Sequence, residues 1–566
     1  MIFGFLFPIV FIGLIVLGVR RLRAGPSQDG IQSASIRRFF QYSLLYGLIV
    51  VVGNGLSGLL GLWIANSDVL VSNQTELARN VSFVVVGIPM YLAIALWARR
   101  QYVADPAEAK SFGWSLYFTL ATLTFLIGAS LGLREVLSWA SGIASYQDHQ
   151  MAQFIIWGGL WGGHWWTNRR LAPPDNSRAH NILGSLYGLG FLATGLIELL
   201  SGAVARALNF GRSSLFIAQE NSLVSGAVTA LVGLLIWLLY WLRTTLKATR
   251  DVMWLAYVML VGAGGGLVMA IISLSVVLYS WLVWLFGTPT SSVAPIHFNS
   301  FPVAASAAVV GGVLWWYHRT VLHEDGKTIR TEVRRVYEYL MSAIGLLASA
   351  IGVAIVLVAL VDAFTESNRI AGAGSRNTLL AALTLLVVGS PIWGIYWNRI
   401  QKFVQNDPDV EHASPSRRVY LFVLFGIGGL IAAVTLLIGV FLLFDDIFKG
   451  NFGAETIRRI RVPLAMLLST GGVAGYHWLV YRTERESYAL VATRRCLVVL
   501  VGPHDSEMLR VIGEKGGVKV QAWSRSDSLN TNWTVESILQ AIHENEGNDL
   551  LILSTAKGLE VIWLET

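Results

Sequence analysis

The sequence predicts an all-α polytopic membrane protein with a small α/β domain at its C-terminal end. Hydrophobic residues make up 54% of the 566 residues, and charged residues only 14%, against roughly 25% in soluble domains. Apolar stretches long enough to cross a bilayer recur along most of the chain. From about residue 490 the pattern changes to short alternating segments, which are typical of a soluble domain.

Thirteen stretches have the length of a transmembrane helix, which needs about 20 mostly apolar residues. They cover 2–19, 39–64, 81–98, 112–133, 151–168, 181–201, 221–242, 252–286, 301–317, 336–361, 377–398, 419–444 and 462–481. The first stretch has no basic residue before it, and three arginines follow it. We therefore expect a retained anchor over 1–24 and not a cleaved signal peptide.

Glycine clusters predict where helices approach each other closely, because small residues let two backbones come together. The 252–286 stretch is longer than one straight span requires, and its segment 262–266 predicts a kink or tight packing. Adjacent glycines also occur in other stretches, where we expect close helix contact. These pairs are 158–159, 162–163, 311–312 and 471–472.

Lysine and arginine are distributed unevenly between the loops on the two sides of these helices. With the N-terminus outside, the cytoplasmic loops carry 27 of them and the opposite loops carry 9. Because cytoplasmic loops are enriched in basic residues, we predict this orientation, with the C-terminus in the cytoplasm. The cluster at 449–461 is the one loop that argues against it.

After the first helix the chain forms six helical hairpins whose returning helices have alternating endings. Hairpins one, three and five end with a tryptophan two residues before an arginine, and the others carry a histidine at the matching place. The repeating unit is therefore four helices long, which predicts tandem repeats at 36–170, 178–320 and 334–482. All three run in the same orientation, either around a pseudo-threefold axis or in a row.

Similar motifs open the repeats. They are Arg37-Arg-Phe39, Arg334-Arg-Val-Tyr337 and, at the start of a second hairpin, Arg417-Arg-Val-Tyr420. With the repeats, these motifs resemble uncharacterised bacterial multi-pass membrane proteins built from a repeated four-helix domain of unknown function. The resemblance covers about 36–482 and implies a bacterial inner membrane, but it supplies no activity and no site residue. The middle repeat departs from it, because it opens on Arg178-Ala-His-Asn181.

The segment 490–566 is predicted to be a small cytoplasmic α/β domain of order βαβαββ. We expect strands at 496–501, 518–523, 550–553 and 559–563, and helices at 505–515 and 534–544. No G-x-G-x-x-G motif and no Walker lysine accompany its first strand and helix. We therefore interpret the domain as a docking or dimerisation module.

Three histidines, His164, His318 and His477, are candidate ligand-binding residues, since a neutral imidazole in a helix bundle can hold haem, chlorophyll-type magnesium or copper. Each lies within about a turn of a basic helix end, among tryptophans and tyrosines, where amphipathic rings settle for interfacial reasons alone. The matching positions of the other hairpins are tryptophans, which cannot ligate. With one cysteine in the chain, we expect no cofactor and no metal.

Two further candidate binding residues lie inside predicted spans. Glu198 interrupts an apolar run, and an intramembrane carboxylate is by default a functional candidate. Counting about 1.5 Å per residue from Arg178 places it close to the outer interface, within reach of water. Asn54 is the most polar deep position, and a helix–helix hydrogen bond is its simpler interpretation.

The sequence favours no enzyme, because it contains no H-E-x-x-H, no G-x-S-x-G and no paired carboxylates at catalytic spacing. We expect a non-catalytic assembly, scaffold or signalling protein. Its partners would be the lipid bilayer and a protein or second copy bound through 490–566, with no nucleic acid. The alternative is an uncoupled transporter or channel for a neutral or lipid-like solute, lined by the three repeats.

Overall fold

The computed structural model describes most of the chain, in two compact units. It covers residues 29–65, 74–171, 178–208, 217–322, 331–365, 373–406, 408–493, 496–524, 533–545, 548–555 and 558–564. The predicted anchor over 1–24 lies outside these residues. The first unit is Met1–Arg399 and the second is Ile400–Thr566.

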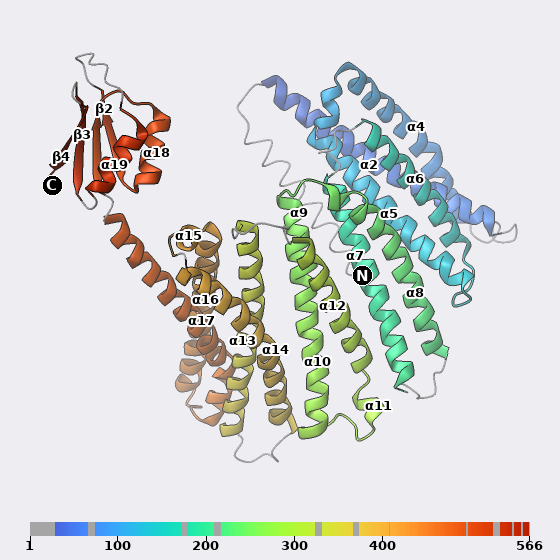
Figure 1. Ribbon diagram of the computed structural model, residues 1–566. Helices are drawn as coiled ribbons and strands as arrows, with labels where there is room; N and C mark the ends of the chain where they lie inside the picture. The colour runs from blue at the N-terminus through green and yellow to red at the C-terminus, as the bar shows by residue number, and fades with distance from the viewer. Residues whose placement is uncertain are drawn as a thin grey trace. The chain divides into compact units, whose positions relative to one another are not determined.

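Long helices joined as hairpins make up the first unit (Figure 1). They are α2 (Asp29–Ile64), α4 (Gln74–Ala104), α5 (Phe112–Ala140), α6 (Asp148–Leu171), α7 (Arg178–Ala207), α8 (Ile217–Trp237), α9 (Val252–Ala256), α10 (Gly266–Phe286), α12 (Phe301–Leu322), α13 (Glu332–Thr365) and α14 (Ala373–Asn406), whose end belongs to the second unit. Shorter elements are η1 (Pro106–Lys110), η3 (Leu238–Leu242), η4 (Thr245–Lys247), η5 (Tyr257–Gly265) and α11 (Ala294–His297). The π-helical segment η5 joins α9 to α10, so 252–286 is one helix that widens beside its glycine-rich segment.

Nine helices in the described part of the chain are long and apolar enough to cross a membrane. They coincide with nine of the thirteen predicted spans. Helices also form over the predicted spans 151–168, 301–317 and 462–481, but they are not among the nine. These three helices have the length of a span but not the apolar character of the nine, so the three spans stay predictions.

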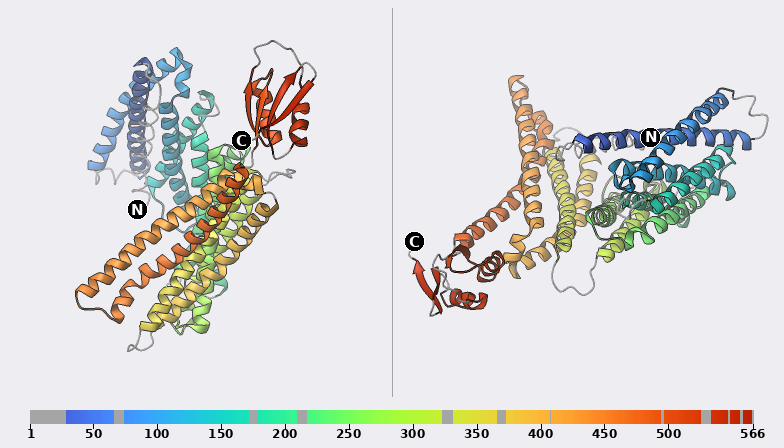
Figure 2. Two further views of the ribbon diagram at one scale, coloured as in Figure 1. Left: turned by 90° about the vertical axis from the view of Figure 1, so that its left-hand side faces the viewer. Right: turned by 90° about the horizontal axis from the view of Figure 1, so that it is seen from above.

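Neighbouring hairpins of the first unit contact each other in the order of the chain. Helix α2 contacts α5 and α6, and α5 contacts α7 and α8. Further along, α7 contacts α12 and α10 contacts α13. Within the first unit the hairpins therefore follow one another in a row (Figures 1 and 2).

Glycines bring α7 and α8 into direct backbone contact. A Cβ at Gly195 would overlap the backbone of Ala230, and a Cβ at Gly226 would overlap that of Leu199. The glycines concerned recur at seven-residue spacing on the two helices, as 188, 195 and 202 and as 226 and 233. Such spacing keeps small residues on one helix face, so the helices pack along most of their length.

The adjacent glycine pairs, in contrast, are mostly not contact points, which corrects the prediction. Only Gly311 approaches another helix closely, since a Cβ there would lie 2.8 Å from the nitrogen of Ala270. A Cβ would meet nothing within 4 Å at Gly159, Gly162, Gly163, Gly312, Gly471 and Gly472. Two neighbouring residues point in different directions on a helix, so a pair does not line a contact face as seven-residue spacing does.

The second unit contains a helical hairpin and the α/β domain. Its helices are α15 (Pro408–Ala413), α16 (Pro415–Phe448), α17 (Ala454–Thr493), α18 (Ser506–Gly516) and α19 (Val535–Glu544), and its strands are β1 (Leu497–Val501), β2 (Lys519–Trp523), β3 (Asp549–Thr555) and β4 (Gly558–Leu564). The strand order is β2-β1-β3-β4, with β1 parallel to β2 and β3, and β4 antiparallel to β3. The observed order βαβαββ is the predicted one.

Both helices of the α/β domain cover the same face of the sheet (Figure 1). Its core unites Val498, Leu500, Leu550 and Ile552 of the strands with Ile512, Ile538, Ala541 and Ile542 of the helices. Because side chains alternate along a strand, the other residues form a second face, which we call the open face. It consists of Leu497, Val499 and Val501 of β1, Lys519, Gln521 and Trp523 of β2, Asp549, Leu551 and Leu553 of β3, and Glu560, Ile562 and Leu564 of β4.

Candidate functional site

Each four-helix repeat packs a histidine near the end of its last helix against a tyrosine of the preceding helix. The pairs are Tyr117–His164, Tyr257–His318 and Tyr420–His477, each with ring centroids 5.8 Å apart. The tyrosine always lies six residues after a residue that caps or precedes the helix, namely Ser111, Asp251 and Ser414. The three candidate histidines therefore occupy equivalent positions, one in each repeat.

The hydrogen bonds of the three histidines fix which ring nitrogen carries the proton. In each case Nδ1 bonds the carbonyl oxygen four residues earlier, at 2.8–2.9 Å. A carbonyl only accepts, so Nδ1 is the donor and Nε2 of the neutral ring is the acceptor. At His164 this acceptor receives the Tyr117 hydroxyl at 2.8 Å. This repeat thus uses the histidine to join α5 and α6.

His318 is completely buried among aromatic rings. Trp241, Tyr257 and Tyr317 surround it at centroid distances of 5.0–5.9 Å. Its opposite side lies against Gly262, where a Cβ would overlap the imidazole. Its Nε2 has no hydrogen-bond partner among the residues that the structure describes. This packing explains the glycine in η5 and leaves no opening for a planar macrocycle at His318.

Tryptophan–tyrosine hydrogen bonds join one repeat to the next. Trp161, at the end of the first repeat, donates its Nε1–H to the Tyr240 hydroxyl of the second at 2.8 Å. Trp315, at the end of the second, donates to Tyr337 of the third at 3.1 Å, and Tyr337 bonds Tyr396 at 3.0 Å. Both tryptophans lie three residues before the repeat's histidine. We call these two contacts the repeat joints.

The first repeat lacks the acceptor residues, and the last repeat lacks the donor residue, that a further repeat joint would need. Phe40 and Leu96 occupy the positions of Tyr337 and Tyr396, and their side chains are 66% and 53% exposed. Ala474, three residues before His477, occupies the position of the donating tryptophans. At these positions the donor and acceptor residues occur where one repeat meets another. The second repeat also has tryptophan–tyrosine bonds inside it, from Trp241 to Tyr317 at 2.8 Å and from Trp237 to Tyr257 at 3.3 Å.

A buried histidine that the sequence analysis did not select lies at the first joint. His180 takes the place of Tyr337 in the middle repeat and contacts the Tyr240 ring edge-on, with centroids 6.1 Å apart. Neither ring nitrogen has a hydrogen-bond partner within the described structure. The available signal was the unusual opening of that repeat, Arg178-Ala-His.

Buried acidic residues neutralise the arginines that open the repeats. Glu108 is 1% exposed and accepts from Arg38 Nε at 2.7 Å and from Arg37 at 3.2 Å. In the third repeat Glu338, also 1% exposed, pairs with Arg334 at 3.3 Å. The sequence analysis missed both acids. The arginine pairs themselves were the signal, because a buried carboxylate requires a cationic partner and these arginines supply it.

The structure does not bring together the two candidates from inside the predicted spans, Glu198 and Asn54. Glu198 is half-buried on α7, and no side-chain hydrogen bond of it is seen in the described structure. Asn54 is exposed and donates to the carbonyl of Val50 on its own helix at 2.8 Å, so the expected helix–helix bond is not formed. The buried amide is that of Asn80, which packs against Gly58. Among described residues, no contact joins any two of Glu198, Asn54, His164, His318 and His477.

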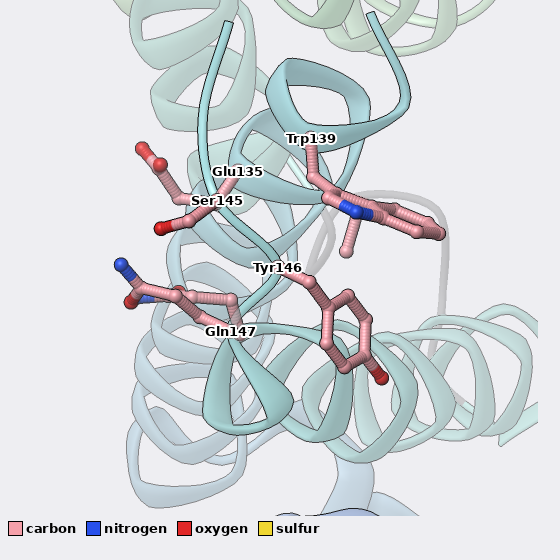
Figure 3. Close-up of a pocket in the computed structure, with 7 residues that line it drawn as sticks. Glu135, Trp139, Ser145, Tyr146 and Gln147 are labelled. Carbon is pink, nitrogen blue, oxygen red and sulfur yellow. The ribbon is translucent and has the colours of Figure 1, made fainter. Parts of the chain in front are cut away.

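A small pocket opens where α5 turns into α6 (Figure 3). Its lining includes Glu135, Trp139, Tyr146 and Gln147, which come from the end of α5 and the following loop. The space is about 10 Å³, about what one water molecule occupies. In the described part of the chain, no group of three His, Cys, Asp or Glu residues is placed to hold a metal ion. Because its volume is close to that of one water molecule, the pocket offers no room to an organic substrate.

The repeated Tyr–His pair, the joints and the row of hairpins define a helical protein built from tandem four-helix repeats. A family model described as a domain of unknown function (DUF5671) matches residues 38–163, 178–313 and 335–472, which together make up more than half of the chain. The chain belongs to this family and carries its domain three times, as the sequence predicted. Neither the curated proteins nor the solved structures give a match.

Proposed function

We propose that this protein is a non-catalytic assembly platform of the bacterial inner membrane, which binds a protein partner through its α/β domain. The observation that carries the proposal is the open face. Leu551 and Leu553 at its centre are partly exposed, Val499 beside them is only 7% exposed, and Trp523 and Ile562 at its edges are 58% and 39% exposed. A four-stranded sheet covered by helices on one side only leaves an apolar surface that a partner can cover.

The platform would span the membrane thirteen times, with its N-terminus outside and the α/β domain in the cytoplasm. The uneven distribution of basic residues supports this orientation. The loop at 449–461 argues against this orientation: Lys449 pairs with Asp445 at 2.8 Å and Arg459 pairs with Asp446, but acidic residues contribute little to the rule. Cysteine labelling of the loops in intact cells measures the orientation directly.

The membrane repeats would act as the rigid support of the platform. Their repeat joints and their buried Tyr–His pairs fill the helix contacts with hydrogen-bonded aromatic side chains, which favours one fixed packing. The alternative function, an uncoupled transporter for a neutral or lipid-like solute, requires a solute-sized cavity between helices. The pocket beside Glu135 is about the size of one water molecule and does not favour it.

The test compares full-length protein purified gently in native lipid with two variants. Ile562→Lys places a charge on the open face, whereas Glu507→Lys places the same charge on exposed α18 as a matched control. We expect the wild type and the control to retain a protein on the α/β domain, either a partner or a second copy, and Ile562→Lys to lose it. Equal retention by all three, or a bare domain in the wild type, would refute the proposal.

A further inference from the structure

The open face carries two charged side chains that have no ion pair within the described part of the chain, Lys519 and Glu560. Lys519 begins β2 and lies level with Leu497, at the start of β1. Glu560 lies on β4 opposite Leu553, which in turn lies level with Val501 at the end of β1. The two charges therefore occupy diagonally opposite corners of the sheet, and the apolar residues lie between them.

We infer that the partner of the open face is a second copy of this chain, packed face to face about a two-fold axis. This inference rests on the proposed function and names the occupant of that surface. A two-fold axis along the other diagonal of the sheet places Lys519 of each copy opposite Glu560 of the other. The same axis places Val499 and Leu551 of each copy over the centre of its partner.

The strand geometry makes this orientation compatible with known sheet packing. Three gaps of about 4.8 Å across the sheet and four steps of about 3.3 Å along it give a nearly square face of about 14 by 13 Å. The diagonal of such a face makes about 45° with the strands. Rotation about that diagonal sets the strands of the two sheets about 90° apart, which is one of the two preferred angles of packed sheets.

Self-complementary charge distinguishes a second copy from an unrelated partner. A heterologous partner needs only an apolar surface, whereas one lysine and one glutamate at opposite corners satisfy each other in a two-fold pair. Trp523 lies near the proposed axis, at a third corner, so the tryptophans of the two copies would meet there. The contact would pair Lys519 with Glu560 at both ends, and Asp549, the third charged residue of the face, accepts from the backbone N–H of Leu497.

The small area of the face predicts a weak contact, which must be measured in the membrane. A face of about 14 by 13 Å is well below the roughly 800 Å² per partner of a stable soluble complex. The membrane holds both copies in one plane and raises their effective concentration, so a weak contact is sufficient there. We therefore expect the pair in the bilayer and its dissociation on dilution in detergent.

Cross-linking of the full-length protein in its native membrane tests the inference. Cys496 is the only native cysteine, so Cys496→Ser gives a background without thiols. In that background Trp523→Cys should give a dimer with a short bismaleimide, whereas Lys515→Cys on exposed α18 should remain monomeric. Adding Lys519→Glu or Glu560→Lys should each reduce the dimer several-fold. Combining both changes should restore it, because the charges are then exchanged and again opposite.

The outcomes separate this inference from the proposed function. A cross-link from Trp523→Cys to a different protein refutes self-association and leaves the platform proposal intact. No cross-link from this position to any protein refutes both. A dimer that survives both single charge changes refutes the two-fold orientation and the inference with it. Loss in the single variants without recovery in the double variant also counts against it.

Discussion

The second repeat joint allows a quantitative test of what holds neighbouring repeats together. Tyr337→Phe removes one hydroxyl, which accepts from Trp315 and bonds Tyr396. Hydrogen bonds between membrane helices contribute about 0.6 kcal/mol each on average, so two of them predict a loss of about 1 kcal/mol. If the buried Trp315 N–H finds no other acceptor, the cost rises to as much as about 3 kcal/mol.

The assay is the free energy of unfolding of the full-length protein in a mild detergent, with Tyr279→Phe as the matched control. The Tyr279 hydroxyl has no hydrogen bond within the described residues, so its removal should change the free energy by less than about 0.5 kcal/mol.

Trp315→Phe and the double variant complete a mutant cycle, for which we expect a coupling energy of at least about 0.5 kcal/mol. Equal stability of the two tyrosine variants, or a coupling energy near zero, would show that the joint does not stabilise the contact between repeats.

Three further predictions follow from the packing of the first unit. Gly195→Ala should lower the free energy of unfolding by about 1–3 kcal/mol, because its Cβ overlaps the α8 backbone. The control Gly190→Ala, whose Cβ meets nothing within 4 Å, should leave thermal unfolding unchanged. Equal effects of the two changes would contradict the close contact. Glu108→Gln should cost about 1–3 kcal/mol, since its arginines are only partly exposed, and the exposed pair partner Glu76 changed to Gln should cost under about 1 kcal/mol. Purified protein should show no visible absorbance, because His318 is enclosed by rings; a band lost in His318→Ala would overturn this.

The local pattern of the sequence was sufficient to predict the elements but not their long-range partners. The α/β domain shows why prediction succeeded there. Its strands are short apolar runs between glycines and polar turns, and its helices begin at Asp505 and Thr534, whose side chains cap them. These signals lie within a few residues of the boundaries that they set.

The candidate site was only half predictable for the same reason. His164 and His318 stand out in the sequence because they recur at matching positions. Their tyrosine partners lie 47 and 61 residues earlier, and their position after a helix cap does not indicate which helix they contact. The bond from Trp161 to Tyr240 spans 79 residues. Such pairs depend on which hairpins become neighbours, which periodicity within one helix does not encode.

The residues at the two ends of the series of repeats differ from those at the joints. Only the middle repeat has both a joint donor, Trp315, which bonds the third repeat, and a joint acceptor, Tyr240, which accepts from the first repeat. Phe40 and Ala474 close the series at the first and last repeats, much as capping modules end a solenoid. A gene duplication that copied the middle repeat would therefore yield a longer protein with every joint complete. Copying the last repeat would leave Tyr337 of the new copy facing an alanine, without a donor.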